Sequence, residues 1–537
     1  MSVEDVRDSS IHLPPAISVC TARWALAGAM VVAMLLLAKQ LAMAQIATKD
    51  ACAYYLPLAR LAAAGDPAGV EHPMIPPVYV WATAWAAGLF AGWADAFETA
   101  GRMVSAASVL ATVLLVYVLA AGLATRRVAL AAAALAACNP WVIRLGANVG
   151  PESLYSLWLT ATVAALAVYW RRPSVAMAAA AAATSALAPL TRSEGLFLPV
   201  VTAAALAFFG LARRCKSAVA RHLLIWGVIT LVFWAPRARS IQRQTGFYAL
   251  DIRMLYMVPP IRRHLPAFLG TPPHQRAAVA VGSLGSGRAV GAALDEAQES
   301  LLMVIGPVTW AMLLLWFLGR RYLGEPARSQ VRAPRGPVLL IAAICVFQLI
   351  AVAPVKMDRR YVVSIAPLLQ VFAGLGLVSL VELLRLLRGV IGRLGRSIPA
   401  QLVGLALLVG AHAAWSVMMT NVGARHAELR ALGALAGEML GPGRTYLATS
   451  PEAAYYARGS SVLLMWDDPR ASLSMPQLLS ACRQHRVDAI VLREGETWAD
   501  GLEALPADSP AIIASAGRGP EAKLIDAAAL AAAESPP

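Results

Sequence analysis

The chain has 537 residues, of which 59% are hydrophobic and 14% are charged, and its formal net charge is +15. The apolar residues gather in runs close to the ~20 residues that cross a ~30 Å hydrocarbon core, which excludes an ordinary soluble protein. Nearly all of the 46 basic residues are arginines that separate these runs instead of forming one polar stripe, so the charge does not indicate a nucleic-acid partner. We therefore expect a mainly α-helical, polytopic membrane protein.

The apolar runs predict about eleven membrane crossings. The first run shows no small-residue cleavage pattern and exceeds the roughly 7 to 15 residues of a signal-peptide core, so we interpret it as an anchor behind a cytoplasmic tail, residues 1–23. This count places arginine clusters such as Arg126 and Arg127, or Arg171 and Arg172, on the cytoplasmic side, as the positive-inside rule requires. The predicted spans are 24–45, 101–122, 127–144, 152–170, 174–190, 194–212, 221–236, 300–319, 337–354, 361–384 and 398–418.

An apolar stretch at 76–93, PPVYVWATAWAAGLFAGW, is left out of this count. Counting it would invert every later loop and place the arginine clusters outside. Its aromatic residues favour a helix that lies in the outer membrane interface, within a first outer loop that we predict over 46–100. A half-inserted helix and an ordinary span are the alternatives.

Two later regions differ from the membrane spans in composition. The predicted outer loop at 237–299 contains a Gly/Ser-rich segment, VGSLGSG, and is interpreted as a gate over a site or as a plain linker. After residue 424, short β-like apolar runs such as DAIVLRE alternate with helical segments, which predicts a small extracytoplasmic α/β domain over 425–530. The predicted membrane domain then covers 24–420.

Four charged features meet on the outer side in this topology. They are Asp50 after the first span, the turn NPWVIRLGANVGPESLY at 139–155, LTRSEG at 190–195 and PVKMDRRY at 354–361. Their carboxylates and basic groups share a boundary layer of low dielectric, where charge interactions are strengthened. This combination suits an anionic lipid as substrate. The charged candidates are Asp50, Glu152, Arg192, Lys356, Arg359 and Arg360.

These motifs, in this order, resemble the GT-C superfamily of polyprenyl-phosphate-sugar-dependent glycosyltransferases. The segments that carry the resemblance are KDACAYYLPLARLAAAGD followed by HP, NPWVIRLGANVGPESLY, LAPLTRSEGLFL and RRYVVSIAPLL. The most similar branch contains protein O-mannosyltransferases and lipid A aminoarabinose transferases. The resemblance implies a GT-C-like helix bundle in the cytoplasmic (inner) membrane, with its active site on the periplasmic or extracellular side. The implied partners are a polyprenyl-phosphate-linked sugar donor, a lipid, glycan or protein acceptor, and membrane lipids.

The resemblance also implies roles for individual residues. In that superfamily an acid at the outer end of the first span is the proposed catalytic base, and Asp50 occupies that place, although the following residue is not the second acid of many relatives. An acid in the second outer loop corresponds to Glu152, the second candidate catalytic residue, which could fix a sugar hydroxyl. Basic residues that hold the lipid phosphate in the superfamily resemble Arg359 and Arg360 beside Tyr361. The nearby Lys356 is a further candidate for that role.

The same residues fit such a reaction on chemical grounds. When a hydroxyl or amine attacks an anomeric carbon, a carboxylate such as Asp50 can accept its proton, which contributes ~10²- to 10⁴-fold. The departing phosphate gains negative charge, and the guanidinium groups of Arg192, Arg359 or Arg360 can bind its oxygens through paired hydrogen bonds. A single displacement inverts the anomeric carbon. The sequence has no glycine-rich nucleotide loop, so sugar nucleotides are not expected as direct donors.

Further candidates for substrate contact are Glu194, His72 and Tyr54. Glu194 and His72 have structural alternatives, since Glu194 can pair with the arginine two residues before it and His72 can cap the interfacial helix. No cofactor is certain. Asp50 or Glu152 could bind a divalent cation through hard oxygen ligands, but no cluster of carboxylates defines a complete cage. The six cysteines show no CxxC spacing, so neither zinc nor a disulfide framework is indicated.

A transporter or flippase of a lipid-linked sugar is the main alternative, because it also places charges in a membrane cavity. Transporters commonly show repeated halves and helices broken at mid-membrane, and we find no such duplication in this sequence. A receptor that uses its outer domain for binding is a third interpretation. The enzyme requires Asp50, whereas the receptor does not.

Overall fold

The computed structural model of the chain consists of two units, and each is described by itself. The first comprises Met1–Leu41 and Leu61–Thr420, and the second comprises Ala42–Arg60 and Asn421–Pro537. Lys356, most of the predicted span at 398–418 and most of the predicted loop at 237–299 lie outside the described residues. The structure describes residues 18–43, 47–93, 95–212, 216–251, 298–319, 323, 335–352, 359–391, 410, 413–414, 427–448, 451–463, 475–493, 509, 511–516 and 522–533.

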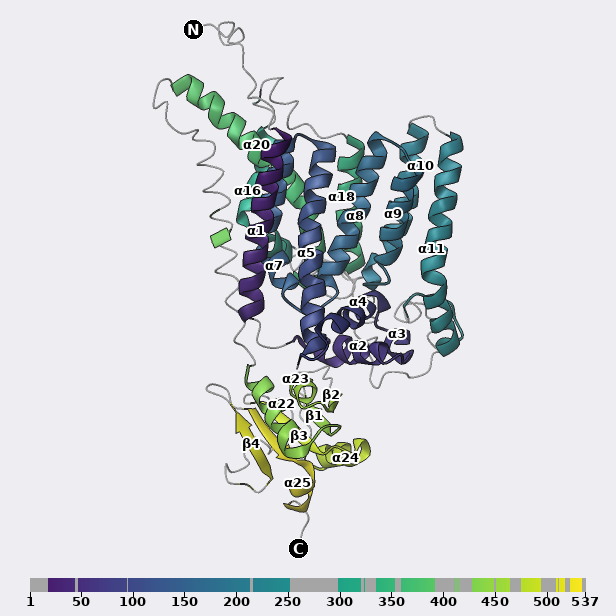
Figure 1. Cartoon of the computed structure of the whole chain (residues 1–537), viewed down its shortest axis with the longest axis vertical. Coiled ribbons are helices and arrows are strands. Elements are labelled where there is room, and N and C mark those ends of the chain that lie inside the picture. Colours follow the sequence, from purple (N-terminus) through teal and green to yellow (C-terminus); the bar gives the residue numbers. More distant parts are fainter. Residues whose placement is uncertain are drawn as a thin grey trace, which may run out of the picture. The chain divides into compact units, whose positions relative to one another are not determined.

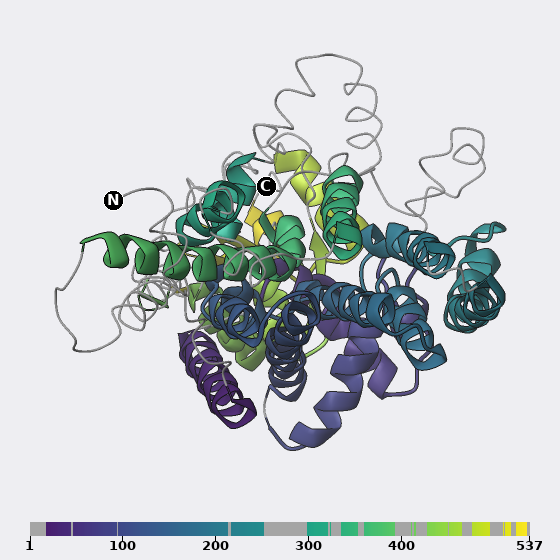
Figure 2. The ribbon, with the colours of Figure 1, turned by 90° about the horizontal axis from the view of Figure 1, so that it is seen from above.

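The first unit is a bundle of helices that run side by side (Figure 1). Seen from above, α1 and α11 lie at edges of the bundle (Figure 2). In the most apolar 18-residue stretch of each of these two helices only 17% is buried, compared with 94% for the stretch within Arg359–Leu383, which overlaps α20. The helices of the bundle are α1 (Val19–Met43), α5 (Ala96–Leu123), α6 (Arg126–Ala137), α7 (Pro140–Gly146), α8 (Glu152–Arg171), α9 (Val175–Leu187), α10 (Phe197–Ala212), α11 (Lys216–Thr245), α16 (Pro307–Gly319), α18 (Arg335–Val352) and α20 (Ala366–Ile391).

The helices of the first unit follow the apolar runs of the sequence. Six described helices are long and apolar enough to cross a membrane, and two bent pairs of helices qualify if each pair is one span. The helices at 175–187 and 335–350 are apolar but shorter. Each predicted span up to residue 384 thus coincides with an apolar helix or a bent pair. The chain is a multi-pass membrane protein.

The predicted spans 127–144 and 300–319 are both broken in the structure. α6 and α7 are bent by 58° relative to each other, and the helices on either side of Gly306 are bent by 97°. The second helix of each pair begins with a proline. Proline has no N–H, so it is tolerated in the first turn of a helix, whereas in a helix interior it breaks the hydrogen-bond pattern. Gly306 adopts the left-handed φ of 80°, and Asn139 accepts hydrogen bonds from two backbone N–H groups at the start of α7.

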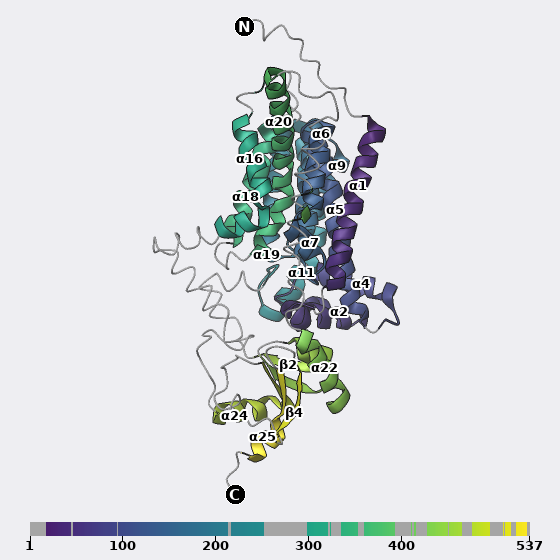
Figure 3. The same cartoon turned by 90° about the vertical axis from the view of Figure 1, so that its left-hand side faces the viewer.

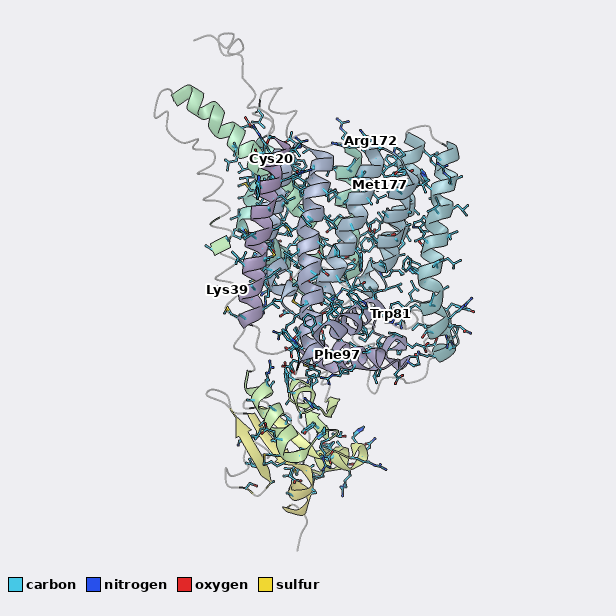
Figure 4. The ribbon with its side chains drawn as sticks, in the orientation of Figure 1. Cys20, Lys39, Trp81, Phe97, Arg172 and Met177 are labelled. Atoms are coloured by element: carbon cyan, nitrogen blue, oxygen red, sulfur yellow. The ribbon has the colours of Figure 1, made fainter. Side chains whose placement is uncertain are left out.

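The two ends of the bundle carry different labelled residues. Figure 4 places Arg172 and Met177 at one end, and Trp81 and Phe97 at the other. Arg172 belongs to a predicted cytoplasmic loop and Trp81 to the predicted first outer loop. The two loops therefore lie at opposite ends of the bundle, as the predicted topology requires.

The helix predicted to lie in the membrane interface is α4 (Pro77–Ala87). Its 11 residues extend roughly 16 Å, about half of a ~30 Å hydrocarbon core, so α4 alone is too short to cross it. Trp81 and Trp85 on α4 are 58% and 76% exposed, and Trp93 beyond it is 63% exposed. Exposed tryptophans of this kind are typical of a membrane interface. The preceding short helices are α2 (Leu56–Ala63) and α3 (Ala68–Glu71).

Two glycines let α20 approach its neighbours closely. A Cβ atom built on Gly374 would lie 2.8 Å from the carbonyl oxygen of Val128 on α6. A Cβ atom built on Gly376 would overlap the carbonyl oxygen of Met312 on α16. Small residues at such contacts allow helices to pack where lipid removes the hydrophobic driving force between them. α20 is therefore packed between α6 and α16.

The second unit contains a five-stranded sheet with the strand order β2–β1–β3–β5–β4. β1 pairs in parallel with β2 and β3, whereas β5 pairs in antiparallel fashion with β3 and β4. The strands are β1 (Thr445–Ala448), β2 (Ser460–Leu463), β3 (Ala489–Arg493), β4 (Ile512–Ala516) and β5 (Ala522–Asp526).

Helices cover both faces of this sheet (Figure 3). Neighbouring residues of β1 point to opposite faces, so Tyr446 packs with α22 and α23, and Leu447 packs with α24 and α25. The second unit thus has an α/β architecture of three layers. The helices are α22 (Ala427–Leu440), α23 (Glu452–Tyr456), α24 (Met475–His485) and α25 (Ala527–Ala533).

Gly376→Ala is expected to destabilise the first unit by about 1 to 3 kcal/mol, because the new methyl group overpacks the contact between α20 and α16. Thermal unfolding of the full chain in detergent, followed by tryptophan fluorescence, measures the effect. Gly122→Ala on α5 is the matched control, since a Cβ atom there meets nothing within 4 Å. Equal melting temperatures for the two variants would contradict this packing.

Candidate functional site

The guanidinium group of Arg192 joins two carboxylates in the first unit. Its Nε and Nη2 atoms donate to the two carboxylate oxygens of Glu194, at 3.3 and 3.0 Å, and its Nη1 atom donates to Oε1 of Glu152 at 2.5 Å. Between 10 and 13% of each side chain is exposed. Buried charges need such pairing, because each ion alone carries a desolvation cost of several kcal/mol.

Tyr361 links this ion pair to the arginine beside it. The Cζ atom of Arg192 lies 4.7 Å from the centroid of the Tyr361 ring, and that of Arg360 lies 5.0 Å from it. Arg360 also donates a hydrogen bond of 3.3 Å to the Tyr361 hydroxyl. We name Glu152, Arg192, Glu194, Arg360 and Tyr361 the Tyr361 cluster. It brings together three of the four outer segments that the sequence predicts to meet.

Arg359 is more exposed than the residues of the cluster. Its Nη2 atom donates to Glu299 at 3.2 Å, and the two side chains are 38% and 67% exposed. Its Cζ atom lies 5.7 Å from the centroid of the Trp141 ring. Exposed ion pairs contribute ~0 to 1 kcal/mol, so this guanidinium can exchange its partner for an anionic ligand at little cost.

Glu152 begins α8, where the helix dipole favours a carboxylate. A side chain at Gly150 would displace that carboxylate, because a Cβ atom there would overlap Oε2 of Glu152. The N–H of Gly150 donates to the Tyr79 hydroxyl at 2.8 Å, and this hydroxyl donates to the carbonyl oxygen of Gly101 at 2.9 Å. The buried Tyr79 thus fixes the turn before Glu152 to α4 and α5.

The loop that carries Arg192 is tightly packed. The N–H groups of Thr191 and Arg192 donate to the carbonyl oxygen of Ala188, at 3.0 and 2.9 Å. A Cβ atom at Gly195 would approach the carbonyl carbon of Ala188 to 2.7 Å and the ring of Tyr155 to 2.9 Å. Glycine at this position therefore lets the loop pack against the ends of α9 and α8.

A hydrogen-bonded chain that the sequence motifs did not predict adjoins the cluster. The Tyr155 hydroxyl donates to Oε1 of Gln348 at 2.6 Å, and Nε2 of Gln348 donates to the carbonyl oxygen of Tyr361 at 3.3 Å. Tyr155 and Gln348 are buried. Gln348 itself was the available signal, because a polar side chain inside an apolar run needs a partner within the membrane.

His72 lies in a segment that the buried Arg237 holds in place. The Arg237 guanidinium donates to the carbonyl oxygens of His72, Pro73 and Ile75, at 2.8, 3.0 and 3.4 Å. Burial, and after it the positive charge of Arg237, lowers the pKa of His72 to about 4. The ring Nδ1 atom accepts a hydrogen bond of 3.3 Å from the N–H of Met74. These contacts give His72 a part in shaping the chain before α4.

Asp50 belongs to the second unit, so the Tyr361 cluster is described without it. It directly precedes a π-helix, η1 (Ala51–Tyr55), in which the N–H of Leu56 donates to the carbonyl oxygen of Ala51. Such turns are rare and are frequently found at functional sites. Burial raises the pKa of Tyr54, and the negative charge of Asp50 adds to that effect.

Among the described residues we looked for a metal site and for a pocket that involve the predicted site residues. Among the described residues, no group of three His, Cys, Asp or Glu side chains is placed to hold a metal ion. Glu152, one of the predicted cation ligands, is engaged by Arg192. An open cleft of about 830 Å³ is lined by Trp81, Trp85, Phe97 and small residues, and none of the predicted site residues lines it.

Comparisons with known proteins support the resemblance found in the motifs. Residues 72–238 match the family described as dolichyl-phosphate-mannose-protein mannosyltransferase, and no curated protein sequence matches the chain. The structure is similar to that of the Archaeoglobus fulgidus oligosaccharyltransferase in the apo form, with 14% identity and a TM-score of 0.59 over 87% of this chain and 69% of that one. It is also similar to ArnT from Cupriavidus metallidurans bound to undecaprenyl phosphate, with 15% identity and a TM-score of 0.55 over 92% of this chain and 97% of that one.

At these identities the structural matches show the fold, which is that of the GT-C glycosyltransferases. The family match covers the chain from the segment before α4 to α11, and so includes Glu152, Arg192 and Glu194. The chain therefore has the GT-C fold that its motifs predicted.

Arg192→Met is expected to destabilise the first unit by about 3 to 5 kcal/mol, because it leaves two buried carboxylates without their shared cation. Arg243→Met is the matched control: Arg243 pairs with Glu71 at 3.9 Å with 67% of its side chain exposed, and such a pair contributes ~1 kcal/mol at most. Thermal unfolding of the full chain in detergent compares the two variants. If both melt at the same temperature, the buried ion pair is not formed.

Proposed function

We propose that the chain is an inverting glycosyltransferase that moves a hexose or pentose from a polyprenyl monophosphate to an acceptor at the outer face of the cytoplasmic membrane. The Tyr361 cluster is the observation that carries this proposal. It gathers arginines and carboxylates from three distant segments within an apolar helix bundle. Such a setting suits a substrate with an anionic head and a lipid tail.

Arg359 and Arg360 bind the lipid phosphate in this proposal, with Lys356 as a further candidate. Two carboxylates already neutralise Arg192, so its role is to hold the cluster together. Within the described part of the chain, the ion-pair partner of Arg359 is the exposed Glu299, and Arg360 lies over the Tyr361 ring. Guanidinium groups fixed in this way stabilise the negative charge that the phosphate gains as its bond to the sugar breaks.

Asp50 is the general base of the proposed reaction. An acceptor oxygen or nitrogen forms a bond to the anomeric carbon while the bond from that carbon to the phosphate oxygen breaks, and the electron pair of the broken bond stays with the phosphate. The acceptor's proton passes to the Asp50 carboxylate. One displacement inverts the anomeric carbon.

The donor class is inferred from the superfamily. The similar ArnT structure contains undecaprenyl phosphate, and the matching family is described by a dolichyl-phosphate-linked mannose. Both are polyprenyl phosphates with an anionic head. The sugar and the acceptor depend on pocket contacts that a shared fold does not determine.

Arg360→Met is expected to weaken the binding of undecaprenyl phosphate about 10-fold or more, because a hydrogen bond to a charged group contributes about 1.5 to 3 kcal/mol. Native mass spectrometry of the full chain in lipid nanodiscs, with undecaprenyl phosphate added, measures the affinity. Arg243→Met again provides an exposed arginine as the control. If Arg360→Met binds undecaprenyl phosphate with unchanged affinity, the Tyr361 cluster is not part of the donor site.

Asp50→Asn is expected to lower sugar transfer at least 10²-fold while leaving the binding of undecaprenyl phosphate unchanged. Mass spectrometry of lipids and surface glycans from a strain that lacks the chain identifies the missing modification. The amount of this modification that is restored when each variant is expressed in that strain measures its transfer activity. Asp66→Asn, which changes an exposed acid in the same loop, is the control. Wild-type transfer by Asp50→Asn would contradict the base assignment. A lipid-linked sugar trapped in the inner leaflet of that strain would favour a flippase instead.

A further inference from the structure

The segment that carries Asp50 packs against α23 in the second unit. Ala47, Ala51 and Leu56 are buried, with at most 2% of each residue exposed. The Thr48 hydroxyl accepts a hydrogen bond of 3.3 Å from the N–H of Ala51, and its carbonyl oxygen accepts one of 3.0 Å from the N–H four residues later. The segment is therefore folded locally and contacts α23 in the C-terminal part of its own unit.

Two neighbouring tyrosines of α23 contact the two ends of this segment. The Tyr456 hydroxyl accepts a hydrogen bond of 2.8 Å from the N–H of Ala47. The Cζ atom of Arg60 lies 4.6 Å from the centroid of the Tyr455 ring. The two rings meet edge to face, with their centroids 5.2 Å apart, so each supports the position of the other. Asp50 lies between these two contacts in the chain.

α23 is itself held by the α/β fold. It packs so closely on α22 that a Cβ atom at Gly433 would overlap the carbonyl oxygen of Ala453. Arg430 of α22 lies over the Tyr456 ring, 5.0 Å from its centroid. Ala453 and Ala457 belong to the same buried cluster as Tyr446 of β1. A contact that originates on such a packed helix restrains a segment more than one that originates on another loop.

We propose that the C-terminal α/β part of the second unit positions the general base, with Tyr456, Tyr455 and Arg60 as positioning residues. This proposal rests on the proposed function, because it takes Asp50 as the base. A base has to lie within hydrogen-bond distance of the group whose proton it accepts, and a displacement of about 1 Å can lower a rate about 10²-fold. The α/β part supplies the restraint through a main-chain hydrogen bond at one end of the segment and a cation over a ring at the other.

Hydrogen exchange on the full chain in lipid nanodiscs tests the restraint itself. Tyr456→Phe removes the hydroxyl that accepts from Ala47 and keeps the ring, so amide exchange in peptides covering 47–56 is expected to accelerate about 5-fold. Tyr446→Phe is the matched control, because the buried Tyr446 hydroxyl has no hydrogen-bond partner within the described part of the chain. Exchange at the wild-type rate in Tyr456→Phe would overturn the restraint.

Sugar transfer tests the consequence for the reaction. Tyr456→Phe and Arg60→Leu are expected to lower transfer about 5- to 10-fold, while the affinity for undecaprenyl phosphate and the melting temperature stay unchanged. Arg60→Lys keeps a cation over the Tyr455 ring and is expected to retain most of the transfer. Equal transfer by Tyr456→Phe and Tyr446→Phe would overturn the positioning role. A loss of transfer that is matched by a loss of donor affinity would overturn it as well.

The Asp50→Asn variant separates this proposal from the proposed function. If Asp50→Asn transfers sugar at the wild-type rate, the general-base assignment fails and the positioning role fails with it. If Asp50→Asn is inactive and Tyr456→Phe transfers at the wild-type rate, only the positioning role fails. Faster exchange together with slower transfer in Tyr456→Phe supports both proposals.

Discussion

The ion pair of Arg192 with Glu152 and Glu194 is the constraint on which the candidate site depends. Charges removed from water need partners, and these three side chains satisfy each other only if the start of α8 and the loop before α10 meet. The Tyr361 ring packs against the Arg192 guanidinium, so the segment before α20 lies beside this ion pair. Arg360, the residue before Tyr361, lies over the same ring.

This constraint separates the roles of the charged residues. Arg192 holds Glu152 in a buried ion pair, and this is one reason why the proposed base is Asp50. In the proposed reaction Arg192 holds the cluster together, whereas Arg359 has a solvent-exposed partner that an anion can replace. The proposed division is thus between charges that hold the site together and charges that act on the substrate.

Hydropathy predicted the helices well because the bilayer dictates the composition of any segment that crosses it. The breaks at Asn139 and Gly306 were not predicted, since an average over a whole run does not register one proline or one left-handed glycine. Charged residues at the span ends were predicted as candidates, but the hydrogen bonds of Gln348 and Tyr456 were not. Contacts between distant segments depend on how each helix is rotated and packed, and neither quantity can be read from the pattern of a single sequence.

The most direct test of the central claim is a structure of the full chain in lipid nanodiscs with undecaprenyl phosphate added. The account predicts a phosphate about 3 Å from the guanidinium groups of Arg359 and Arg360, in a cavity that the Asp50 carboxylate also faces. A phosphate bound in the cleft beside Trp81, or an Asp50 side chain that faces away from the phosphate, would contradict it.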